Sequence, residues 1–286
     1  MTRRIKATCK GFTLIELITV IIVLGVVSVG ISGFIRTGVD IYSDVSERDQ
    51  LLGNSRFFVE RLNRELRMAV PNSIRVANNP ANTIQCIEFV PANWVTFYTS
   101  LPKAPDLSTA VTVVEIAGNP AGYQVNNGDF AVVYPTQSSD VYNLGNNKRQ
   151  EITACTDSDG NCNNVADPSD TERTAELTVT AAFADYSPAS RLYFATETVS
   201  YCLRDIDNKV YRHQSNIFND VQDIYTTGGV LMAENLMNNL GLAEQQAFRV
   251  IAASLTRNAL VQVLLTFELN EEIVNYSNEV HIPNVP

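Results

Sequence analysis

The chain opens with a long run of apolar residues that contains almost no charge. Residues 17–35 carry no ionisable side chain, and Glu16 is the only one between Phe12 and Ile35. As an α-helix, residues 12–35 would be about 36 Å long, which exceeds the roughly 30 Å hydrocarbon core of a membrane. The pattern therefore predicts a membrane-spanning helix over residues 12–35.

Beyond residue 35 the apolar positions become periodic, as in an amphipathic helix. Around the helix axis they occupy an arc of about 140° and form one apolar stripe. The residues of this stripe are Val45, Leu51, Leu52, Phe58, Val59, Leu62, Leu66 and Ala69. Pro71 cannot continue a helix and disfavours helix at the preceding residue. We therefore expect one helix from Phe12 to about Ala69, roughly 87 Å long, whose second part, residues 36–70, packs against a globular head.

After Pro71 the pattern changes to short β-branched and aromatic runs separated by Asn, Pro and Gly, which predicts strands. The expected strands are 84–89, 94–98, 111–116, 130–134, 177–183, 198–203, 209–212, 249–253, 260–269 and 273–282, the last three as an antiparallel meander. Asp207-Asn208 suits a two-residue hairpin turn. Residues 136–173 are expected to form a long surface loop, and Leu231–Leu240 a short helix. The predicted fold class is α+β, with a long N-terminal helix on a largely antiparallel sheet and a head over residues 71–286.

Charge separates the first ten residues from the rest of the chain. The 286 residues have a net charge of −10, yet the N-terminal leader holds four basic and no acidic residues: Arg3, Arg4, Lys6 and Lys10. Basic residues beside an apolar span favour the cytoplasmic side, which places the head outside the cytoplasm. Without the leader, the chain has 17 basic and 31 acidic residues. Such an acidic head is a poor binder of nucleic acid.

The junction between leader and apolar run carries a specific string, Gly11-Phe12-Thr13-Leu14-Ile15-Glu16. It resembles the class III signal of type IV prepilins and pseudopilins, whose fold is also α+β. The resemblance implies that a prepilin peptidase cleaves between Gly11 and Phe12 and methylates Phe12. It also implies that Glu16 pairs with the amine of Phe12 on a neighbouring subunit. A secretory signal fits poorly, because no Ala-x-Ala-like site follows Ile35; an uncleaved anchor is the remaining alternative.

Two further stretches, residues 56–75 and 228–235, resemble the MshO-type minor pilins of the mannose-sensitive haemagglutinin (MSHA) pilus, relatives of the J-type minor pseudopilins of type II secretion. The resemblance implies a minor pilin of the tip or initiation complex. Its partners would be other minor pilins, the major pilin, the prepilin peptidase and the inner-membrane assembly platform. It would be a single-pass inner-membrane protein with a periplasmic head, carried to the pilus or pseudopilus tip on assembly. The alternatives are a J-type pseudopilin, or a tip-displayed adhesin that contacts a surface or glycan through its acidic loop and the Trp94 region.

Few residues suggest chemistry in the head. There is no nucleophile elbow, phosphate loop or zinc-protease motif, so we expect no enzyme. Cys9 lies in the leader, and the other four cysteines allow three pairings; we expect Cys155–Cys162 and Cys86–Cys202, with a zinc site as the less favoured alternative. Asp157, Asp159 and Asn161 resemble part of a calcium loop. That loop lacks the closing Glu, so a disulfide-closed turn is favoured and no other cofactor is expected.

Overall fold

The computed structural model describes residues 11–115, 124–156, 174–251, 259–270 and 272–282. The chain forms two compact units, residues 1–51 and 52–286, which are described separately. The divisions that the sequence suggested at residues 11, 35 and 70 stay predictions.

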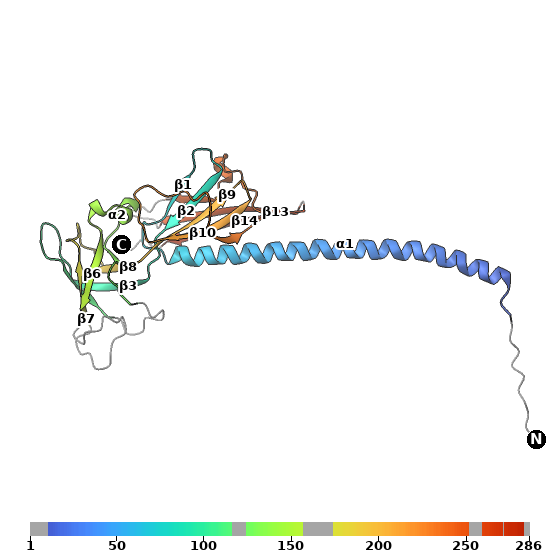
Figure 1. The fold of residues 1–286 in the computed structure, drawn as a ribbon, viewed down its shortest axis with the longest axis horizontal. Helices are drawn as coiled ribbons and strands as arrows, with labels where there is room; N and C mark the ends of the chain where they lie inside the picture. Colours follow the sequence, from blue (N-terminus) through green and yellow to red (C-terminus); the bar gives the residue numbers. More distant parts are fainter. Residues whose placement is uncertain (1–10, 116–123, 157–173, 252–258, 271, 283–286) are drawn as a thin grey trace, which may run out of the picture. The chain divides into compact units, whose positions relative to one another are not determined.

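Helix α1 runs from Leu14 to Arg67, 54 residues, and confirms the prediction of one long helix (Figure 1). It ends two residues before the expected position, where Met68 N–H donates to the Glu65 carbonyl and Ala69 N–H to the Leu66 carbonyl, at 3.1 and 3.2 Å. These tighter bonds close the last turn. In the first unit, every residue from 17 to 35 is exposed. By length and composition this helix could cross a membrane.

The last turns of α1 belong to the second unit and pack on the head. Phe58, Val59, Leu62 and Leu66 are fully buried, as the apolar stripe predicted. The Phe58 ring lies 5.9 Å from the ring of Tyr201 on the five-stranded sheet. The stripe does not extend to Val45, which is exposed.

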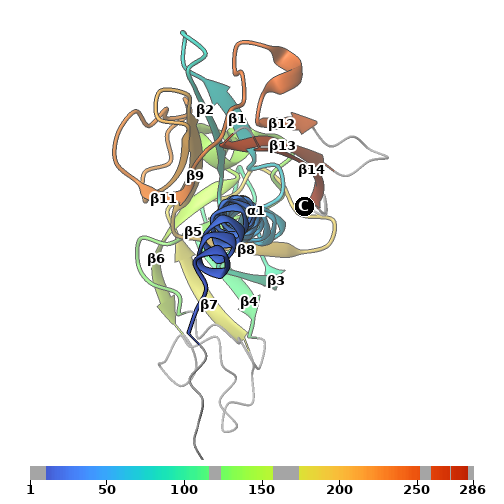
Figure 2. The ribbon, with the colours of Figure 1, turned by 90° about the vertical axis from the view of Figure 1, so that its right-hand side faces the viewer.

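The head contains two open antiparallel sheets. The five-stranded sheet has the order β1 (Arg75–Asn78), β2 (Ile84–Phe89), β9 (Thr198–Arg204), β10 (Lys209–Ser215) and β11 (Val230–Ala233). The three-stranded sheet is the predicted meander β12 (Phe248–Ile251), β13 (Ala259–Leu269) and β14 (Glu272–Ile282). Within the head, β12 lies beside β1 and β2 (Figure 2).

The remaining strands close into a barrel, which the sequence did not predict. Its order is β3 (Trp94–Ser100), β4 (Ala110–Val114), β7 (Thr174–Val179), β6 (Arg149–Thr156), β5 (Phe130–Val132) and β8 (Arg191–Ala195). It has its own core, which includes Val111, Ile152, Leu177, Leu192 and Phe194. The fold class is therefore the expected α+β, pilin-like architecture, but the head holds a barrel beside its sheets.

Three local predictions were wrong. Leu231–Leu240 is not a helix: its first residues belong to β11, and a short 3-10 helix, η2 (Ala243–Gln245), follows later. Residues 136–156, expected as loop, contain α2 (Ser138–Tyr142), the 3-10 helix η1 (Leu144–Asn146) and β6. The hairpin between β9 and β10 exists, but Arg204 pairs with Lys209, so its loop has four residues.

Candidate functional site at the start of helix α1

The residues around Gly11 lie just outside the helix. Residues 11–13 have no regular secondary structure, and Phe12 is 76% exposed. Thr13 caps the helix, because Leu17 N–H donates to its carbonyl at 3.2 Å and Glu16 N–H to its hydroxyl at 3.4 Å. Thr13-Leu14-Ile15-Glu16 also has the spacing of a capping box. The Gly11–Phe12 peptide bond therefore lies in exposed, non-helical chain.

Glu16 lies in the first turn of α1, where the helix dipole favours a carboxylate. Its side chain is exposed, and within the described residues no cation lies in ion-pair distance of it. The residues that follow it are apolar on every face of the helix, including Ile21, Ile22 and Val29, each more than 60% exposed. Among the described residues, Glu16 is thus a single carboxylate without a neighbouring cation, in the first turn of an apolar helix.

The cysteine prediction is confirmed where the structure describes it. Cys86 on β2 and Cys202 on β9 face each other directly across the two strands and form a disulfide. Cys155 is also disulfide-bonded. Its expected partner Cys162 lies outside the described residues, and that pairing stays a prediction.

The calcium candidates Asp157, Asp159 and Asn161 lie outside the described residues as well. In the part of the chain that the structure describes, no three His, Cys, Asp or Glu side chains are grouped so as to hold a metal ion.

The Trp94 region is largely barrel structure. The half-buried Trp94 ring stacks on Phe194 with centroids 4.8 Å apart. Tyr98 is buried, and its hydroxyl accepts from the Ser187 N–H at 2.7 Å. Of the three aromatic residues in this strand, Phe97 alone is exposed, at 46%.

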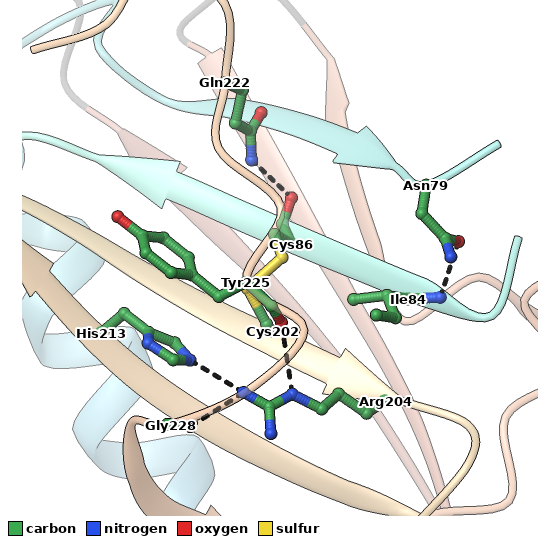
Figure 3. The surroundings of a disulfide bond; sticks show 9 residues. All are labelled: Asn79, Ile84, Cys86, Cys202, Arg204, His213, Gln222, Tyr225 and Gly228. Atoms are coloured by element: carbon green, nitrogen blue, oxygen red, sulfur yellow. Dashed lines mark hydrogen bonds between the residues drawn. A yellow bond between two sulfur atoms is a disulfide. The ribbon is translucent and has the colours of Figure 1, made fainter.

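Sequence reasoning missed a segment that covers the disulfide. Residues 216–229 connect β10 to β11, and we call them the strap. Figure 3 shows Gln222 and Tyr225 of the strap beside Cys86 and Cys202, and Gly228 beside Arg204. The only sequence signal was Gly228-Gly229, whose φ angles of 73° and 90° suit glycine.

Buried charges lie at both ends of the strap. Burial raises the pKa of Glu88, although Arg75 at 2.7 Å opposes the shift. Burial lowers the pKa of Arg149 to about 10. His213 is neutral near pH 7, because burial and the Arg204 guanidinium lower its pKa to about 4.

Comparison with known proteins agrees with the N-terminal site. Residues 6–32 match the prokaryotic N-terminal methylation motif, a span that includes Gly11, Phe12, Glu16 and most of the apolar run. No curated protein and no solved structure matches the chain. Proteins with this motif are typically structural rather than catalytic.

Proposed function

We propose, from a methylation motif that supports the type IV pilin and pseudopilin family, that this chain is a minor pilin. In this proposal it joins other minor pilins in the tip or initiation complex of an MSHA-type pilus. The family-level part rests on residues 6–32. The finer part rests on the resemblance of residues 56–75 and 228–235 to MshO-type minor pilins.

Maturation would begin at the cytoplasmic face of the inner membrane. The prepilin peptidase would cleave between Gly11 and Phe12 and methylate the new amine of Phe12. The exposed, non-helical chain at residues 11–13 supports this step, since the peptide bond can enter an active site without unwinding α1. Helix residues 12–35 would then anchor the protein in the inner membrane, with the head in the periplasm.

Glu16 would guide assembly. An unpaired carboxylate within lipid or among apolar helices is costly, and a cation that neutralises it is favoured. The described chain has no such cation near Glu16, so the amine of Phe12 on an adjacent subunit would supply it. The pair would set the axial position of one subunit against the next, and the apolar surfaces of the helices would then pack side by side.

The observation that carries this proposal is the Gly11–Glu16 string at the junction of a basic leader and an exposed apolar helix. Glu16→Gln tests it, because Gln keeps the capping-box geometry and removes only the charge. We expect normal cleavage after Gly11, measured by mass spectrometry, but loss of the protein from sheared filaments. Glu60→Gln, an exposed carboxylate on the same helix, is the control and should be incorporated normally.

Two outcomes would contradict the proposal. If the Glu16→Gln protein is incorporated into filaments like the wild type, the charge pair has no role in assembly. If the mature protein still carries residues 1–11, cleavage after Gly11 does not take place. Deletion of the gene distinguishes a priming role, with piliation lost, from an adhesin, with pili intact and attachment lost. The neighbouring genes distinguish a pilus from a type II secretion system.

A further inference from the structure

The strap covers the face of the five-stranded sheet opposite to α1. Side chains alternate along a strand, so Tyr201 faces Phe58 of the helix while Cys202 faces the strap. Ile224 and Tyr225 pack against the disulfide, and both Cys86 and Cys202 are 0% exposed. A thiolate must reach one of these sulfurs to reduce the bond, so the closed strap blocks it.

The strap is attached almost entirely through side chains. Within the described chain, none of its backbone groups is hydrogen-bonded to another backbone group. Instead, Arg75 donates to the carbonyls of Asn219 and Asp220, both at 2.8 Å. By contrast every residue of β9 is paired with β10, and every one except Thr198 is also paired with β2.

The middle and the far end of the strap are held in the same way. Gln222 donates to the Cys86 carbonyl at 2.8 Å. Arg204 donates to the carbonyls of Tyr225 and Gly228, at 3.2 and 2.8 Å. The Arg204 nitrogen that donates to Gly228 also lies 3.3 Å from Nε2 of His213, and the His213 ring stacks on Tyr225 with centroids 4.2 Å apart (Figure 3).

The near end is held by stacked rings. Phe218 of the strap packs edge-on against Phe130 of the barrel with centroids 4.7 Å apart. The Arg149 guanidinium lies over both rings, at 4.3 and 4.4 Å. These contacts are all between side chains, so they can break without disturbing a strand.

We propose that the strap opens locally while the sheet stays folded, and that this opening controls thiol–disulfide exchange at Cys86–Cys202. In the open head, a thiolate attacks one of the two sulfurs and forms a mixed disulfide. The other cysteine leaves as a thiolate and takes up a proton. The second thiolate of the reductant then attacks the reductant's sulfur in the mixed disulfide, so that the reductant is oxidised to a disulfide and the remaining protein cysteine leaves as a thiolate and takes up a proton. The partner class is a dithiol oxidoreductase, and dithiothreitol serves as its probe. This inference is independent of the proposed role in pili.

Gly229 provides a sharp test. A Cβ at this position would lie 2.6 Å from Cε1 and Nε2 of His213, and the φ of +90° disfavours any side chain. Gly229→Ala therefore disfavours the closed strap. Gly128→Ala is the matched control, because Gly128 has a φ of +94° with nothing within 4 Å of its Cβ and precedes β5 in the barrel. A local opening predicts that Gly229→Ala alone accelerates reduction, by about tenfold or more.

The experiment uses the full chain in detergent with excess dithiothreitol. Free thiols are alkylated at intervals, and peptides containing Cys86 and Cys202 are quantified by mass spectrometry, so that the Cys155 disulfide does not interfere. The reduction rate of the wild type is also measured at low urea concentrations. A local opening exposes little surface, so its free energy depends only weakly on urea. In every variant, hydrogen exchange should be slower at the amides of β9 than at the amides of the strap.

Each contrary result overturns the proposal. If Gly229→Ala and Gly128→Ala change the reduction rate equally, global destabilisation explains both. If the reduction rate of the wild type depends on urea as strongly as complete unfolding does, the strap does not open alone. Gln222→Ala gives a second check, since it removes one strap contact without a steric clash and should accelerate reduction of Cys86–Cys202 but leave the exchange of β9 amides unchanged.

Discussion

Glu65, near the end of α1, fastens the helix to the five-stranded sheet. Its Oε2 accepts from Nε of Arg212 on β10 at 3.0 Å, and its Oε1 accepts from Nε of Arg61 at 3.0 Å. The side chains of Glu65 and Arg212 are 18% and 11% exposed. Removing the carboxylate therefore leaves the Arg212 guanidinium largely buried without its counter-charge.

The magnitude follows from the environments of the two contacts. A hydrogen bond between charged groups away from water contributes about 1.5–3 kcal/mol. The Arg61 contact, with Arg61 33% exposed and one turn away, contributes about 0.3–0.5 kcal/mol. Glu65→Gln keeps the shape and one acceptor, so we expect it to lower the free energy of unfolding by about 1–2 kcal/mol. A double-mutant cycle with Arg212→Gln should give a coupling of about 1–3 kcal/mol.

The assay is urea unfolding of the full chain in detergent, followed by two probes. Fluorescence of Trp94, the single tryptophan, reports on the barrel, and far-UV circular dichroism also reports on the head sheets. Glu60→Gln, exposed on the same helix, should change stability by less than about 0.5 kcal/mol. If Glu65→Gln behaves like Glu60→Gln, or if the cycle shows no coupling, then the Glu65–Arg212 pair does not fasten the helix.

Three further outcomes are expected. Replacing Cys86 and Cys202 together by Ser should lower the free energy of unfolding by about 2–5 kcal/mol in urea titrations, because the disulfide closes a loop across 116 positions. His213 has a pKa of about 4 in the folded head, lowered by burial and by Arg204, so the unfolded chain binds more protons between about pH 6.5 and 4. Stability should therefore fall as the pH falls through this window, and His213→Gln should reduce the difference between pH 7 and pH 5. Calcium should leave the melting temperature unchanged, since residues 157–161 lack a closing Glu; a rise on titration would instead indicate a site there.

Elements with local signals were predictable from the sequence. The strand at residues 84–89 has the expected bounds, because a β-branched and aromatic run is bounded by Asn and Pro. The meander of β12, β13 and β14 was predictable for a similar reason: its strands are consecutive in the chain. The α1 stripe was visible because helical periodicity marks the buried face of a helix whatever element covers it.

The wrong predictions fall where tertiary contacts outweigh local pattern. Leu236 and Leu240 are buried at a spacing of four, as in a helix, but the residues before them pair with β10 as β11. The barrel was invisible because it pairs β3 with β8, whose residues are far apart in sequence. In the polar stretch after residue 136, Asp140 accepts from the Thr136 N–H and hydroxyl and from the Gln137 N–H. These bonds build a turn of helix that hydrophobic patterning does not reveal.

The same reasoning explains why the N-terminal site was predictable and the strap was not. The N-terminal methylation motif is one continuous stretch, residues 6–32, so it is visible in the sequence. The strap is held by Arg75 and Arg204, which reach its carbonyls from positions as far as 145 residues away. Every residue has a backbone carbonyl, so the sequence does not mark which carbonyls accept these bonds, and only the folded structure reveals the attachment. For this chain, the linear motif therefore supports a pilin-type protein, whereas the behaviour of the head depends on contacts that the structure alone discloses.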